Sequence, residues 1–152
     1  MNSILSKLTM AILSLVVSTF VFAADKPKEE WLFVHTAQEV QATSSTLVMP
    51  ISRDIFAFTD RPYRKHSYLT GDKFASLWSD SSSDSFKVNP PNAVLTWIEE
   101  GVIKEVEVVI ANVSSDGKNI TYTLKNNQTL NAELKDVSIF VDADSCHYCG
   151  YD

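Results

Sequence analysis

Alternating apolar and polar side chains predict a series of short β-strands along most of the chain. The alternation is clearest between 119 and 125, where Ile120, Tyr122 and Leu124 are separated by polar residues, as in a strand that buries one face. Further strands are predicted at 31–37, 46–50, 54–59, 92–98, 102–113 and 137–141, and 66–69 is a short extended piece. The pattern is therefore that of a β-rich protein.

One segment has the spacing of a helix instead. Phe74, Leu77 and Trp78 fall at positions i, i+3 and i+4, which places them on one helical face. Thr70 is suited to cap the amino end, since its hydroxyl can accept a backbone N–H. The polar stretch 79–85 follows, so we expect a short helix of about two to three turns.

Turn residues separate these elements. Asp116-Gly117 is a strong hairpin signal between two strands. Asp60-Arg61-Pro62 is typical of a type I turn, because proline fixes φ and aspartate bonds the following amides. The polar stretch 126–136 is predicted to be a connection with room for one more brief strand.

Together these elements predict a mainly β (β-rich α+β) fold, an antiparallel sandwich or barrel of about seven short strands with one short helix. The strands do not alternate with helices as βαβ units require. The large aromatic residues are expected to fill the core. They are Trp31, Phe33, Phe56, Phe58, Phe74, Trp78, Phe86, Trp97 and Phe140.

Residues 1–23 are predicted to be a signal peptide rather than part of the fold. Lys7 precedes an apolar run, and Val21-Phe22-Ala23 places small residues before a cleavage site. Removal leaves 24–152, long enough for a single β-rich domain. We therefore expect a periplasmic or secreted protein of a bacterium, with no membrane span after signal cleavage.

The net charge of the chain limits which classes of partner are expected. The formal net charge is −6, and it becomes −7 when Lys7 leaves with the signal peptide. Nucleic acid is therefore an unfavourable partner, because phosphate backbones bind basic proteins. No motif for a cofactor is visible, and no Gly-x-Ser-x-Gly elbow marks a serine nucleophile.

Several segments together resemble a family of small exported bacterial proteins of unknown function. They include Phe58-Thr-Asp-Arg-Pro-x-Arg and Ser85-Phe…Pro90-Pro-Asn-Ala-x-Leu. The resemblance covers nearly all of 31–142. It implies a bacterial, periplasmic or secreted setting and a single compact domain, and it implies no activity.

The tail 143–152 holds both cysteines of the chain, Cys146 and Cys149. In an exported protein they meet an oxidising compartment, so a short local disulfide is the favoured interpretation. A metal site formed by Cys146, His147 and Cys149 is an alternative, as are a thiol-redox role and free or intermolecular thiols.

The segment 60–66 concentrates positive charge in an otherwise acidic chain. Its arginines could clamp a carboxylate or phosphate, and aromatic rings nearby could stack on a ligand. The candidate surface for a ligand or partner comprises Asp60, Arg61, Tyr63, Arg64, His66 and Trp78. The structural alternative is that Arg61 pairs with Asp60 or Asp54 and holds a turn beneath the helix.

The leading functional hypothesis is a non-catalytic exported β-domain that binds a partner protein or small ligand. Export, a compact β architecture and the basic-aromatic turn favour it. One alternative is a small secreted enzyme, a hydrolase. The other is a metal-binding or thiol-redox protein that acts through Cys146 and Cys149.

Overall fold

A computed structural model describes residues 28–79, 85–143, 146 and 149 of the chain. The predicted signal peptide and His147 lie outside the described residues. No helix in the described part is long and apolar enough to cross a membrane.

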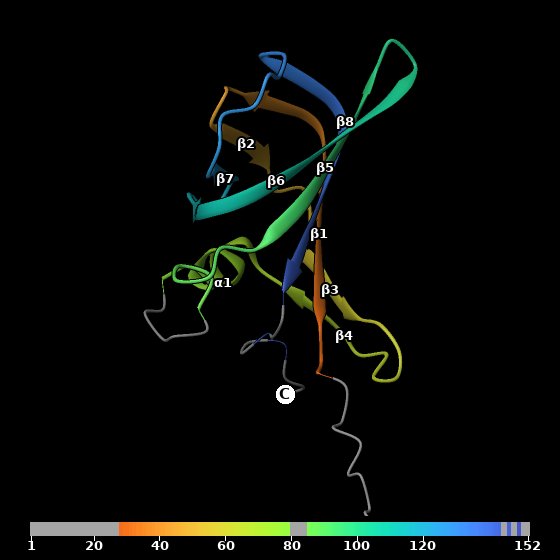
Figure 1. The fold of residues 1–152 in the computed structure, drawn as a ribbon, viewed down its shortest axis with the longest axis vertical. Helices are drawn as coiled ribbons and strands as arrows, with labels where there is room; N and C mark the ends of the chain where they lie inside the picture. Colours follow the sequence, from red (N-terminus) through yellow and green to blue (C-terminus); the bar gives the residue numbers. More distant parts are fainter. Residues whose placement is uncertain (1–27, 80–84, 144–145, 147–148, 150–152) are drawn as a thin grey trace, which may run out of the picture.

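The described chain forms eight strands and one short helix, in the order β1 Trp31–Ala42, β2 Thr46–Pro50, β3 Ile55–Thr59, β4 His66–Leu69, α1 Gly71–Ser76, β5 Asn92–Glu99, β6 Val102–Ser115, β7 Asn119–Leu124 and β8 Glu133–Ala143. Every pairing is antiparallel. The sheet order is β2-β7-β6-β5-β8-β1-β3-β4, and β2 also pairs with β1. Six strands therefore close into a barrel, and β3 and β4 extend from it (Figure 1).

Strand β1 serves both parts of the molecule because it is long enough to have different partners at its two ends. Its first residues pair with β3, with Trp31 opposite Thr59. Its last residues pair with β2, with Ala42 opposite Leu47. Along its other edge it pairs with β8 for most of its length. The predicted antiparallel, mainly β fold is thereby confirmed as a barrel with two added strands.

The barrel interior holds the main core. Phe33, Leu95, Ile110 and Ile139 are fully buried from four different strands. Residues at alternate positions of an antiparallel strand point to one face, so each strand contributes an inner row. Burial of such side chains contributes about 25 cal/mol per Å² of apolar surface.

The helix covers one end of this core. The Thr70 hydroxyl accepts the Lys73 N–H, as expected for an N-cap. Phe74 and Trp78 are 0% and 2% exposed, and their rings meet edge to face at 5.3 Å. The Trp78 Nε1–H donates to the Ile110 carbonyl at 3.1 Å, which ties the helical segment to β6.

The predicted hairpin at Asp116-Gly117 is also confirmed. Gly117 has φ +82, a conformation that glycine adopts without a Cβ clash. The Asp116 carboxylate accepts the N–H groups of Lys118 and Asn119. These bonds to the ionised form lower the Asp116 pKa.

Three expectations need correction. The closing strand begins at Glu133, inside the stretch 126–136 that is expected to be a connection with room for one more brief strand, whereas the extended piece at 66–69 is present as β4. The turn after β3 contains a cis Arg61–Pro62 peptide, as in a type VI rather than a type I turn. Not all large aromatics are core: Phe56, Phe58, Trp97 and Phe140 are only partly buried.

Candidate functional site

The outer face of the sheet carries a second row of apolar side chains. Leu32 of β1 is opposite Phe58 of β3. Val34 of β1 is opposite Phe140 of β8, and Phe140 is opposite Val94 of β5. All five alternate with inward-pointing neighbours, and all five are partly exposed. A continuous apolar surface therefore crosses four strands on the outside of the sheet.

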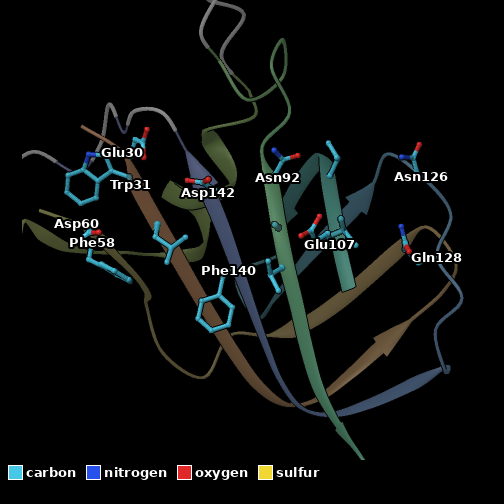
Figure 2. Close-up of a pocket in the computed structure, with 15 residues that line it drawn as sticks. Glu30, Trp31, Phe58, Asp60, Asn92, Glu107, Asn126, Gln128, Phe140 and Asp142 are labelled. Atoms are coloured by element: carbon cyan, nitrogen blue, oxygen red, sulfur yellow. The ribbon is translucent and has the colours of Figure 1, made fainter. Parts of the chain in front are cut away.

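Four of these five side chains form the floor of an open groove of about 700 Å³. Ligand sites in proteins typically have volumes of about 300–1,000 Å³. Leu32, Phe58, Val94 and Phe140 line the groove. The loop after β7 lies along one side and contributes Asn126 and Gln128 (Figure 2).

Four carboxylates surround the floor: Glu30, Asp60, Glu107 and Asp142 line the groove, and all are exposed. No lysine, arginine or histidine is among the described residues that line it. Figure 2 shows Glu30, Asp60 and Asp142 toward one end and Glu107 farther across the sheet. We call this site, floor and carboxylates together, the acidic groove.

The carboxylates that line the groove are not clustered in the way that metal ligands are. Within the described part of the chain, no three His, Cys, Asp or Glu side chains come together as metal ligands. The acidic groove instead combines separated negative charges with an apolar floor. Such an arrangement can attract a positively charged group while an attached apolar body contacts the floor.

Aromatic side chains extend the apolar surface beyond the groove. The Phe56 and Phe58 rings are stacked with centroids 5.5 Å apart. The Tyr68 ring on β4 lies 5.1 Å from Phe56 and is 64% exposed. Because β4 is the last strand of the sheet, this aromatic row leads to an open edge.

Of the six predicted site residues, only Asp60 lines the acidic groove. The others in the turn, Arg61, Tyr63, Arg64 and His66, do not line it. Figure 1 shows the turn after β3 and helix α1 on opposite sides of the lower half of the molecule. The prediction that the turn and the helix share one binding surface is therefore wrong.

Trp78 lies in the core rather than at the turn. It is 2% exposed, and its indole N–H bonds within the barrel. A buried ring cannot stack on a ligand at the surface of the turn. The prediction that Trp78 stacks on a ligand rested on its aromatic ring, and in the structure this ring packs in the core instead.

The turn itself has a different anchor from the one expected. Lys65 Nζ pairs with Glu29 Oε2 at 2.7 Å and lies 5.8 Å from the Tyr63 ring centroid. The Arg61 backbone N–H donates to the Asp60 carboxylate at 2.6 Å. Among the described residues, the Arg61 guanidinium makes no ion pair with Asp60 or Asp54. Ligand binding by the turn stays a prediction.

The cysteine pair is joined, as expected. The Cys146 and Cys149 sulfurs are 1.98 Å apart, a disulfide bond. Cys149 is 4% exposed and packs with the core. Sulfurs bonded to each other are not thiolates and therefore cannot act as zinc ligands. In the disulfide-bonded state, the alternative metal site at Cys146, His147 and Cys149 therefore has no thiolate donors. The thiol-redox role and the hydrolase activity stay predictions.

One buried polar pair lies inside the barrel. The His35 Nε2–H donates to the Pro50 carbonyl at 3.1 Å, and Nδ1 accepts the Tyr122 hydroxyl at 2.9 Å. Burial lowers the His35 pKa and raises the Tyr122 pKa, because it disfavours the charged form of each. With both ring nitrogens bonded, the pair is a satisfied core contact rather than an open site.

The sequence contains a signal for the groove in addition to the alternation that predicts the strands. Around Leu32, Val34 and Phe140, apolar side chains occupy both phases of the alternation. A continuous apolar run indicates a strand that is covered on both faces. Here one cover is the barrel core, and the second is missing among the described residues, which leaves the outer row available to a partner.

Comparisons of the chain with protein-family models, with curated proteins and with solved structures find no match.

Proposed function

We propose that the protein is an exported bacterial domain, periplasmic or secreted, that binds a ligand non-catalytically in the acidic groove. The ligand carries a positively charged amine and an apolar body. The amine lies among the carboxylates, and the body lies on the floor formed by Leu32, Phe58, Val94 and Phe140.

The observation that carries this proposal is the one-sided charge of an apolar groove. Four carboxylates and no basic side chain line it among the described residues. Exposed hydrophobic patches on monomeric domains commonly mark interaction sites, and complementary charge selects the partner. An anionic ligand would be repelled from the same position.

Export is the second part of the proposal. It is supported by the charged and apolar pattern of residues 1–23 and by the disulfide between Cys146 and Cys149. Disulfides form and persist mainly in oxidising compartments. Processing can be checked by the amino-terminal sequence of the protein recovered from a bacterial host, which we expect to begin at Ala24.

Binding is tested with three probes that share one apolar chain and differ only in charge: octylamine, octanol and octanoate. Calorimetric titration, below the micelle concentrations of the two ions and below the solubility limit of octanol, should give affinity in that order. The amine should lose affinity as salt rises, because screening weakens exposed charge pairs. Equal affinity for octylamine and octanoate would contradict the proposal.

Substitutions of the lining carboxylates test whether octylamine binds in the acidic groove. Glu107→Gln together with Asp142→Asn should weaken octylamine by about tenfold, since exposed ion pairs contribute about 0.2–1 kcal/mol each. Glu105→Gln is the matched control, because Glu105 is exposed two positions away on β6 and does not line the groove. If the control weakens octylamine as much as Glu107→Gln alone, general charge rather than the groove is responsible.

A further inference from the structure

The apolar floor of the acidic groove continues along β1 into a second hollow. This hollow has a volume of about 250 Å³ and is lined by Val34, Phe56 and Tyr68, with Asp54 beside them. Val34 is directly opposite Phe140, a floor residue of the acidic groove. The two depressions are therefore neighbours on the same face of the sheet.

A third hollow follows in the same direction. It has a volume of about 840 Å³ and is lined by Thr36, Gln38 and Ser138, with Glu39 and Asp136 at its sides. Thr36 and Arg53 line both the second and the third hollow. The outer face of β1 thus presents a continuous track from Leu32 to Gln38.

The length of this track suits an extended peptide. Leu32 and Gln38 are six positions apart on one strand, which corresponds to about 20 Å at about 3.3 Å per residue. An extended peptide of about seven residues spans the same distance. Its alternate side chains would point to the sheet at intervals that match Leu32, Val34 and Thr36.

Charge along the track selects a basic peptide. Four carboxylates line the acidic groove, one lines the second hollow and two line the third, whereas Arg53 is the one lysine or arginine among the described lining residues. Tyr68, at 64% exposure, also offers an aromatic face to a lysine or arginine. An anionic membrane surface would be repelled by the same carboxylates.

We propose that the track binds an extended basic segment of a partner protein, in which apolar and basic residues alternate. Apolar side chains contact Leu32, Val34 and Phe140, and lysines or arginines reach the carboxylates on either side. This inference rests on the proposed function, because the segment occupies the acidic groove with one end and adds the two further hollows.

The test uses synthetic peptides. A heptapeptide in which four lysines alternate with three valines should bind at least tenfold more tightly than the tripeptide Lys-Val-Lys. Its glutamate counterpart should not bind, and its affinity should fall with salt more steeply than that of the tripeptide, because more exposed charges are paired. Equal affinity of the heptapeptide and the tripeptide would overturn the inference.

Arg53 provides a test with the opposite sign. Arg53→Gln should strengthen the heptapeptide by about two- to fivefold by removing one repulsion, a size expected for an exposed charge pair. It should leave octylamine unchanged, because Arg53 does not line the acidic groove. Lys118→Gln is the matched control, because it removes the same charge from the exposed β6–β7 hairpin.

The outcomes separate the two proposals. If octylamine binding depends on Glu107 and Asp142 while the heptapeptide shows no gain and no response to Arg53→Gln, the track is overturned and the acidic groove stands. If neither octylamine nor any peptide responds to Glu107 and Asp142, both proposals fail. If Lys118→Gln strengthens the heptapeptide as much as Arg53→Gln does, net charge replaces the track as the cause.

Discussion

The inner and outer faces of β1 and β8 carry similar apolar side chains but have different surroundings. On the inner face, Phe33, Ile139 and Val141 are 0–1% exposed, because the closed barrel surrounds them. On the outer face, Val34 and Phe140 have neighbours within the sheet and remain partly exposed. Closure of the sheet thus stabilises one face, and the other face keeps apolar area that a partner can cover.

The polar groups of the two faces also differ in their surroundings: those inside are buried and hydrogen-bonded, and those outside are exposed. Inside, His35 and Tyr122 satisfy each other and a backbone carbonyl, as most buried polar groups do. Outside, carboxylates such as Glu107 and Asp142 are exposed and aligned beside apolar residues. The inner polar pair therefore contributes to stability, whereas the outer charges are exposed and accessible to a ligand.

The largest expected effect is on the inner face. Phe33→Ala should lower the free energy of unfolding by about 3–5 kcal/mol, because it leaves a cavity among packed rings. Phe74 and Phe86 contact this ring, with centroids at 5.4 and 6.2 Å. Urea unfolding followed by tryptophan fluorescence measures the loss. A loss below 1 kcal/mol would mean that the barrel interior is not the main core.

The second-largest loss of stability is expected when the buried hydrogen bond between His35 and Tyr122 is removed. Tyr122→Phe leaves the His35 Nδ1 without its donor, and an unsatisfied buried acceptor costs about 1–3 kcal/mol. The same unfolding measurement at neutral pH tests this. Thr123→Val is a suitable control, since it also removes a hydroxyl from β7 but at a partly exposed position.

The buried histidine also predicts a pH dependence. Burial lowers the His35 pKa below its usual value of 6.5, so the unfolded chain takes up a proton before the folded chain does. Stability should be highest above pH 6.5 and should fall as the pH drops from there toward the folded pKa. His35→Gln should flatten this part of the profile. An unchanged slope in the variant would assign the pH dependence to other groups.

A smaller effect on stability is expected on the outer face. Phe140→Ala should cost about 1 kcal/mol, a typical value for a point mutation away from a sealed core, because the ring is only partly buried. It should weaken octylamine severalfold by removing floor contacts. A stability loss as large as that of Phe33→Ala would show that the outer face is covered, and would contradict the groove.

The smallest expected effect on stability is at the open edge of the sheet. Tyr68→Ser should change the unfolding free energy by no more than about 0.5 kcal/mol, since the side chain is 64% exposed. It should weaken binding of the lysine–valine heptapeptide and leave binding of octylamine unchanged. The reason is that Tyr68 lines the second hollow but not the acidic groove. Titration of both probes against one variant provides the comparison.

Local signals in the sequence were sufficient for most elements. Thr70 as a helix cap and Asp116-Gly117 as a hairpin act over a few residues, and the structure contains both. Period-two alternation likewise identified the inner row of Ile120, Tyr122 and Leu124. These features depend on neighbours in the chain, which is why they could be predicted.

The site could not be predicted in the same way, because it depends on register between distant strands. Glu30, Glu107 and Asp142 are far apart in the sequence and line one groove only when β1, β8, β5 and β6 pair. The charges of the basic turn, in contrast, are consecutive in the chain, so the sequence alone shows them together. Asp60 is the one residue that the predicted surface and the acidic groove share.

The pairing of Trp31 with Ala143 places the start of β1 and the end of β8 side by side. Glu30, immediately before the first of these residues, and Asp142, immediately before the second, belong to the acidic groove. A bulky group attached close to either of these residues would therefore compete sterically with ligands. The tip of the β5–β6 hairpin extends from the opposite end of the molecule (Figure 1). That tip is the better attachment point for immobilising the protein on a sensor.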